Sequence, residues 1–292
     1  MTGAGRASWR VGGLPRTFTK MSGAGNDFLV FGRKLPVGPR EAETIRRLCR
    51  RGTGIGADGV LFVSRRERGA KLVVDLDYFN ADGGPARFCA NGTRCAARFA
   101  ARAAGAEGPL TVRTGWGEIP AQVREDGNVT LSLPEPIALD REVPTFDPAG
   151  RVLEPSAAFL TVGVPHLVVF AAEGVEVETL DVASLGPPLR RHPDLPSGAN
   201  VSFVSLRGAS RLSVRSFERG VEAETLSCGS GVVAAAVVSG LSRGRTPPVS
   251  VATRSGSALV VDFRVEGSLA RDVSLTGDAR FVFEGTLTEE AL

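Results

Sequence analysis

Two cysteine-containing stretches, FCANGTRC at residues 88–95 and LSCGSG at residues 226–231, occupy similar places in the two halves of the chain. Each copy follows a strand-like segment, ending at Phe79 or Phe217, and a polar loop of ten or eleven positions that leads to the cysteine. Each also precedes an alanine-rich stretch typical of a helix. A duplicated unit would place Cys89 and Cys228 opposite one another across a cleft.

On either side of these stretches, many short apolar runs end in Gly, Asn, Asp or Pro, a pattern that is typical of strands. We expect strands over residues 28–31, 60–63, 72–79, 129–133, 167–170, 201–206, 212–217, 249–253, 258–265 and 281–283. We expect helices over residues 41–51, 92–104 and 231–241. The predicted class is α+β, with sheets wrapped around a few central helices.

The domain boundary is predicted in the proline-rich stretch 134–155, whose composition is typical of a connection. We expect a flexible tail over residues 1–16, a first domain over 17–134 and a second over 135–292. The last strand, near 277–285, is a candidate to return to the first domain.

Composition argues against several classes of protein. The net charge is only +3, no dense basic run occurs, and one Tyr and two Trp offer little to stack on bases, so we expect no nucleic-acid partner. No apolar stretch has the length of a membrane span and the N-terminus lacks a signal-peptide core, so we expect no membrane association. Four cysteines without a CxxC pair and two histidines predict neither a disulfide framework nor a metal site, which favours a cytoplasmic location.

Two cysteines at helix starts suggest proton transfer. Unpaired N–H groups there favour a thiolate, so we expect the pKa of both thiols to be lowered, and the same groups can hold a carboxylate. One thiolate would remove a proton from the α-carbon while the opposite thiol returns one, which inverts the centre.

The residues alone leave other interpretations open. Cys89 and Cys228 could form a disulfide, Cys228 could be a hydrolase nucleophile with His166 as its base, or the scaffold could bind a ligand without catalysis. Cys49 and Cys95 are expected to be small buried apolar residues.

Further motifs resemble those of the diaminopimelate epimerase family. They are FTKMSGAGNDF at 18–28, GIGADG at 54–59, YFNADG at 78–83, ERGVEAETLSCGSG at 218–231 and TGDARFVFEG at 276–285, besides FCANGTRC. The resemblance implies two pseudo-symmetric domains, each a curved, mostly antiparallel sheet around a central helix, with the active site in the interdomain cleft. It implies an epimerase without a cofactor that interconverts L,L- and meso-diaminopimelate for lysine and peptidoglycan synthesis. It also implies a small amino-acid substrate as partner and is compatible with a homodimer; a related racemase of another amino acid, such as histidine, is the alternative.

The same resemblance assigns residues. It implies that Cys89 and Cys228 are the acid/base pair, and that His166 and Glu218 support the reacting end. It implies substrate binding by Asn26, Asn80, Asn200 and Arg219 and by the backbone of Ala90, Asn91, Gly229 and Ser230. Three positions depart from the family pattern: Ala90 replaces Gly, Val164 stands where many members have Asn, and one extra residue lies between Glu218 and Cys228.

Overall fold

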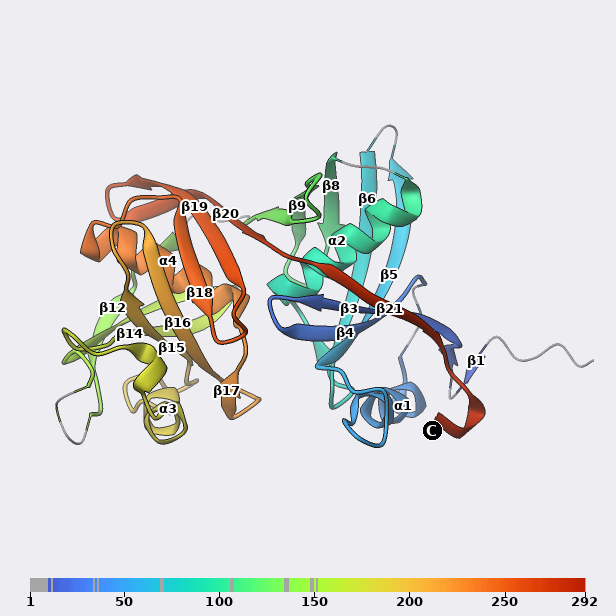
Figure 1. The fold of residues 1–292 in the computed structure, drawn as a ribbon, viewed down its shortest axis with the longest axis horizontal. Helices are drawn as coiled ribbons and strands as arrows, with labels where there is room; N and C mark the ends of the chain where they lie inside the picture. Colours follow the sequence, from blue (N-terminus) through green and yellow to red (C-terminus); the bar gives the residue numbers. More distant parts are fainter. Residues whose placement is uncertain are drawn as a thin grey trace, which may run out of the picture.

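The structure is a computed structural model that describes residues 10–11, 13–33, 35, 37–68, 71–105, 108–133, 137–147, 150 and 152–291. It has the predicted α+β class, and its two halves each wrap a sheet around one central helix (Figure 1). All ten expected strands and all three expected helices are present.

The first half is built from seven principal strands. They are β3 (Thr17–Gly23), β4 (Asn26–Phe31), β5 (Gly59–Arg68), β6 (Lys71–Asn80), β8 (Gly108–Arg113), β9 (Glu118–Val123) and β10 (Val129–Ser132). Helix α1 (Pro39–Cys49) connects β4 to β5. Helix α2 (Ala90–Ala104) follows the short strand β7 (Pro85–Ala86) and leads into β8.

The second half repeats this order. Its principal strands are β13 (Ser156–Val162), β14 (Val164–Phe170), β15 (Asn200–Leu206), β16 (Arg211–Glu218), β18 (Val249–Thr253), β19 (Ala258–Glu266) and β20 (Leu269–Gly277). Helix α3 (Val182–Arg190), which the sequence analysis did not predict, takes the place of α1. Helix α4 (Gly229–Arg243) follows the short strand β17 (Ala223–Thr225), as α2 follows β7.

Strand pairing shows that the two halves are equivalent. Along β3-β4-β5-β6-β8-β9-β10 the pairs are antiparallel, parallel, antiparallel, parallel, antiparallel and antiparallel. Along β13-β14-β15-β16-β18-β19-β20 the same sequence of pairings recurs. The pseudo-symmetry inferred from the two cysteine stretches is therefore a property of the whole fold.

Small side chains allow the sheets to curve closely around α2 and α4. In α2 the buried face is largely alanine, including Ala96, Ala97, Ala100 and Ala101, and residues 232–238 of α4 are all Val or Ala and all buried. Both helices end at a glycine in the left-handed conformation, Gly105 with φ 60° and Gly244 with φ 62°, which closes the last turn without a Cβ clash. The two helices thus enter and leave their sheets in the same way.

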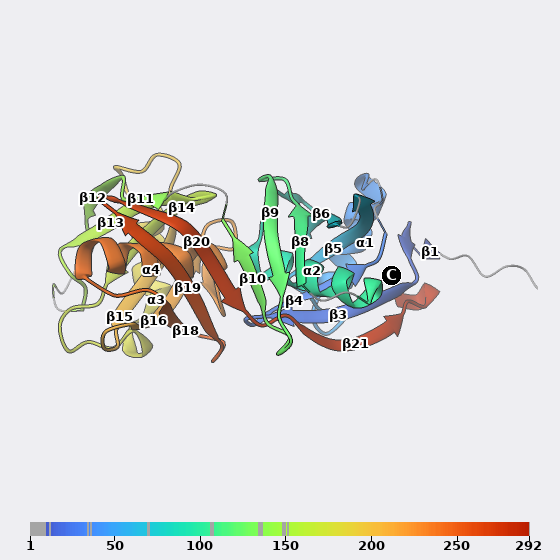
Figure 2. The same ribbon diagram turned by 90° about the horizontal axis from the view of Figure 1, so that it is seen from above.

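The last strand crosses between the halves. Strand β21 (Arg280–Thr286) pairs antiparallel with β3, with Arg280 opposite Ser22 and Thr286 opposite Thr17. Strand β10 pairs with β20, so hydrogen bonding continues from one half to the other. Figures 1 and 2 show β21 running from the second half along the first.

Two segments differ from the expectation of irregular chain. Within the expected tail, residues 1–9 lie outside the described residues, but β1 (Arg10–Val11) pairs with β2 (Leu14–Pro15) and Leu14 is fully buried, so its apolar side chain ties this part to the core. Within the proline-rich stretch, β11 (Ile137–Ala138) pairs with β20 and β12 (Arg141–Pro144) pairs with β13.

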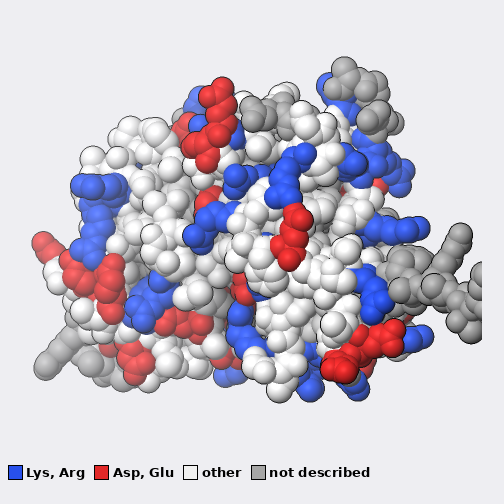
Figure 3. Space-filling model, turned by 45° about the vertical axis from the view of Figure 1, so that its right-hand side comes forward, with Lys and Arg blue, Asp and Glu red and all other residues white. Residues whose placement is uncertain are grey.

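Charged side chains of both signs are interspersed on the face drawn in Figure 3. None of the described helices has the length and apolarity needed to cross a membrane.

Candidate active site

A cleft of about 1060 Å³ lies between the two halves. Its lining includes eleven of the twelve predicted site residues, namely Asn26, Asn80, Cys89, Ala90, Asn91, Asn200, Glu218, Arg219, Cys228, Gly229 and Ser230. The twelfth, His166, is fully buried on β14 and does not line the cleft.

Each cysteine is the N-cap residue of a central helix. Cys89 has extended backbone (φ −146°, ψ 114°) before α2, and its sulfur accepts a hydrogen bond from Gly92 N–H at 3.5 Å. Cys228 has φ −108° and ψ 104° before α4, and its sulfur lies 3.7 Å from Ser230 Oγ. The free N–H groups of both helix starts therefore face the region of the two sulfurs.

The two helix starts are in direct contact. A Cβ added to Gly229 would lie 2.8 Å from the Cβ of Ala90 and 3.1 Å from Asn91 Oδ1. The Asn91 side-chain amide also donates to the carbonyl of Ser227 at 3.4 Å. The convergence of two helix N-termini predicted from the sequence is thus a close contact.

The expectation of lowered thiol pKa values is wrong. Burial raises the pKa of Cys89 to about 11, although N–H groups of Gly92 and Asn91 lower it. Burial and the nearby Glu218 raise the pKa of Cys228 well above its ordinary value, against hydrogen bonds from Ser230 and Gly231. Loss of hydration outweighs the helix ends, so both thiols are neutral at neutral pH. All four cysteines are free.

Burial shifts the pKa values of Glu218 and His166 in opposite directions. Burial raises the pKa of Glu218, against hydrogen bonds from Thr225 and Cys228 that lower it. Burial, with Arg219 nearby, lowers the pKa of His166 to about 3, so its ring is neutral. Neither ring nitrogen has a hydrogen-bond partner within the described chain. The Cys–His hydrogen bond that a cysteine hydrolase would use is therefore missing there.

Asn200 and Arg219 are joined by a hydrogen bond and both line the cleft. Asn200 Oδ1 accepts from the Arg219 backbone N–H at 2.8 Å, and the Arg219 guanidinium donates to the Ser197 carbonyl at 2.9 Å. Asn80 lies at the end of β6, on the opposite half. Amide and guanidinium groups from both halves thus face a shared volume. Among the described residues no group of three His, Cys, Asp or Glu side chains could hold a metal.

Comparison with known proteins places these features in one family. A family model described as diaminopimelate epimerase matches residues 18–137 and 158–282. The chain belongs to the diaminopimelate epimerase family. It is accordingly an isomerase of the epimerase type.

Relatives match over nearly their whole length. Diaminopimelate epimerase of Aquifex aeolicus (strain VF5) is 38% identical over 94% of this chain and 99% of its own. The protein of the same name from Gemmatimonas aurantiaca is 38% identical over 93% of this chain and 99% of its own.

Solved structures share the fold at low identity. A PhzF-family phenazine biosynthesis protein of Bacillus anthracis aligns with a TM-score of 0.64 and 16% identity, covering 94% of this chain and 99% of its own. A hydroxyproline epimerase from Agrobacterium vitis with bound trans-4-hydroxy-L-proline has a TM-score of 0.61 and 18% identity, covering 93% and 92%.

The structure explains how this member of the diaminopimelate epimerase family accommodates its departures from the family pattern. Among the described non-glycine residues, only Ala24, Glu222 and Asp272 have positive φ. The backbone conformation at Ala90 therefore does not require glycine. Between Glu218 and Cys228 the chain makes a turn in which Glu222 has φ 57°. Val164 lines the cleft with 36% of its surface exposed.

The extra residue between Glu218 and Cys228 raises the alternative that Glu222 or Glu224 shares the role expected of Glu218, but both are engaged in ion pairs. Glu222 forms ion pairs with Arg190 and Arg191, both at 2.9 Å. Glu224 pairs with Arg215 at 2.6 Å. Both carboxylates are thus already neutralised, which leaves Glu218 beside Cys228.

Several lining residues were missed by the sequence analysis, among them Tyr78, Trp116, Val221 and Leu226. Trp116 lies in the β8–β9 turn and reaches across to the other half, since a Cβ on Gly163 would be 3.4 Å from its ring. A tryptophan between two glycines, Gly115 and Gly117, is the only local signal of such a role.

Proposed function

We propose that this epimerase interconverts L,L- and meso-diaminopimelate without a cofactor, by proton transfer between Cys89 and Cys228 across one α-carbon. The observation that carries the proposal is the contact of two cysteine-capped helix N-termini in one cleft. In the cell this reaction would supply precursors of lysine and peptidoglycan.

The helix starts would hold the carboxylate at the reacting end. Backbone N–H groups of Ala90, Asn91, Gly229 and Ser230 are the free donors there, and such donors stabilise the charge that develops as the α-proton leaves. One sulfur takes the proton from one face, and the other gives its proton to the opposite face. The carbon inverts, and the thiol and thiolate have exchanged places.

One thiol must lose its proton before the reaction starts. Glu218 is the candidate base for Cys228, because it hydrogen-bonds with the thiol and because burial raises the pKa of its carboxyl, which makes the carboxylate a stronger base. His166 is neutral, so it supplies no positive charge that would stabilise a thiolate.

The distal end of the substrate would be bound by Asn26, Asn80, Asn200 and Arg219. Diaminopimelate carries a second ammonium and carboxylate, which require acceptors and a cation. A two-cysteine racemase of histidine would have no use for this set, so its presence around the cleft favours diaminopimelate.

Two further expectations belong to the proposal. A reducing cytoplasm suits an enzyme that needs both thiols free. A homodimer is supported by the exposed side chains of Val282 (56%) and Phe283 (46%) on β21, and sedimentation velocity would test it.

The deciding experiment follows solvent deuterium into the α-position of L,L-diaminopimelate with the reduced enzyme, beside Cys89→Ala and Cys228→Ala. We expect incorporation with formation of the meso isomer, and loss of turnover in both variants. Full activity of Cys89→Ala would indicate a single-cysteine mechanism. Exchange with histidine in place of diaminopimelate would indicate the alternative racemase.

A further inference from the structure

Arg94 is a fully buried arginine in α2, one turn after Cys89. Its Nη2 donates to Asn91 Oδ1 at 2.7 Å and its Nε donates to the Asp278 carbonyl at 3.2 Å, whereas Nη1 has no hydrogen-bond partner in the described chain. The carboxylate of Asp278 is paired with Arg280 instead, at 2.9 Å. Burying a guanidinium without an ion pair is costly, so this arrangement needs a compensating gain.

The contact with Arg94 determines which way the Asn91 amide points. A guanidinium has only donors, so it must face the oxygen of the amide. The Asn91 nitrogen is thereby directed to Asn26 Oδ1, at 2.6 Å, and to the Ser227 carbonyl, at 3.4 Å. Ser227 directly precedes Cys228, and Asn91 lies two residues after Cys89, so one side chain joins the two cysteine-bearing helix starts.

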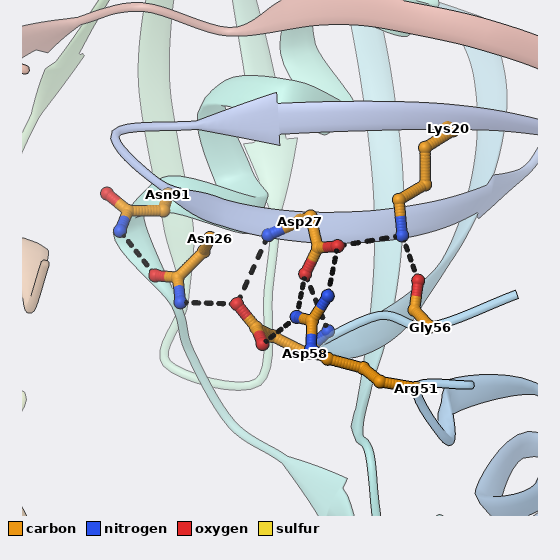
Figure 4. A network of polar contacts seen from close by, with 7 residues as sticks. All are labelled: Lys20, Asn26, Asp27, Arg51, Gly56, Asp58 and Asn91. Atoms are coloured by element: carbon orange, nitrogen blue, oxygen red, sulfur yellow. Dashed lines mark hydrogen bonds and ion pairs between the residues drawn. The ribbon is translucent and has the colours of Figure 1, made fainter. Parts of the chain in front are cut away.

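Asn91 is anchored on its other side by a polar network in the first half (Figure 4). Asn26 donates to Asp58 Oδ2 at 2.9 Å, and Arg51 binds the other oxygen of Asp58 at 2.8 Å. The Asn91 amide is therefore held from two directions, by Arg94 and by Asn26. Its hydrogen bond to Ser227 extends this fixed network to the second half.

We propose that Arg94 and the Asn91 side chain are positioning residues, which hold the start of α4, and with it Cys228, in register with Cys89. The inference rests on the proposed two-thiol reaction. Inversion requires both sulfurs to address opposite faces of one carbon, and misplacement by about 1 Å can cost roughly 100-fold in rate.

The test compares Asn91→Asp, Arg94→Met and Arg94→Lys with wild type. Asn91→Asp keeps an acceptor for Arg94 but replaces the donor to Asn26 and Ser227 by an oxygen that repels both. We expect kcat for diaminopimelate to fall about 10- to 100-fold in Asn91→Asp and Arg94→Met, with KM changed by less than about 2-fold. Arg94→Lys retains a cationic donor and should recover part of the loss.

Arg98→Met is the matched control. Arg98 lies one turn further along α2 and donates to the Ala279 carbonyl at 2.7 Å. Ala279 follows Asp278 in the connection between β20 and β21, and Arg98 has no hydrogen bond to Asn91. Its kcat should stay near wild type. An equal loss of kcat in Arg98→Met would show that the Arg94 effect is merely structural and would overturn the proposal.

A second readout needs no substrate. Diamide oxidation to a Cys89–Cys228 disulfide, followed by mass spectrometry, reports the alignment of the two sulfurs, and its rate should change in Asn91→Asp and Arg94→Met but not in Arg98→Met. If Asn91→Asp shows the kcat and the crosslinking rate of the wild type, the positioning role is refuted. This outcome decides the question even if Arg94→Met does not fold. A wild-type enzyme that crosslinks but does not epimerise diaminopimelate would instead contradict the proposed function.

Discussion

The methyl group of Ala90 fills the space into which a side chain on Gly229 would project. A Cβ on Gly229 would lie only 2.8 Å from that of Ala90, closer than two carbon atoms pack. The first residues of α2 and α4 are therefore complementary, one with a methyl group and one without. Gly229 is needed here for close approach of two helices, since its φ is not in the left-handed region.

This complementarity predicts a compensating pair of substitutions. Gly229→Ala should lower the free energy of unfolding by about 1–3 kcal/mol through overpacking and should reduce kcat, because the helix starts are forced apart. Ala90→Gly on the same chain should restore most of both. Urea unfolding and steady-state kinetics of the two single variants and the double variant measure the coupling; strictly additive effects would argue against the contact.

Thiol reactivity should reflect the raised pKa values. Because burial raises the pKa of Cys89 to about 11, the thiolate fraction is low at neutral pH and grows as pH rises toward that value. We expect iodoacetamide to modify Cys89 in the free enzyme more slowly than a small thiol of pKa ~8.5, with a rate still rising above pH 9. Peptide mapping by mass spectrometry gives the rate at each cysteine, and a midpoint below pH 8 would contradict the prediction.

The ion pairs of Asp27, at the lining of the cleft, should make the free energy of unfolding depend on pH in the acid range. Burial alone would raise the pKa of Asp27, but hydrogen bonds and charges of Arg51 and Lys20 hold it below its ordinary value. A lowered folded-state pKa contributes stability above the unfolded value, near 4, and this contribution is lost as pH falls through the folded pKa.

Asp27→Asn tests this dependence. It should destabilise the protein by roughly 3 kcal/mol at pH 7, because Lys20, which is 6% exposed and lies 2.8 Å from Asp27, loses its partner. The difference from wild type should shrink below pH 4. Denaturant unfolding across pH 3–7 measures it, and a constant difference would count against the assigned ionisation.

Val164 offers a test of substrate preference. It lines the cleft at the start of β14, and the family resemblance leads us to expect Asn at this position. If diaminopimelate is the substrate, Val164→Asn should lower KM about 3- to 5-fold, the value of one hydrogen bond of about 1 kcal/mol. Val164→Thr serves as a control for added polarity without an amide, and an increased KM in Val164→Asn would point to a different ligand in the cleft.

The sequence pattern was enough to predict the duplication, the two central helices and the placement of Cys89 and Cys228 in one cleft. Apolar runs and alanine-rich segments depend on local composition, and both cysteines precede such segments in equivalent positions. The crossing of β21 to β3 was only one of two options, because strand pairing between distant segments leaves little local trace. Helix α3, which carries Pro187 and Pro188 inside it, could not be predicted, since proline normally ends a helix and only tertiary packing overrides that preference.

The order of residues also determined which groups lie at the helix starts, since a cysteine directly before a glycine- and alanine-rich helix lies beside the free N–H groups of its first turn. The protonation state of those cysteines was decided by tertiary structure. Desolvation depends on what covers a thiol. Tyr78 and Trp116 are distant in sequence from Cys228, and Leu226 is distant from Cys89, yet all three line the cleft that contains both cysteines. The same holds for Asn91 and Arg94, whose partners Ser227 and Asp278 are brought to α2 only when the second half folds against the first.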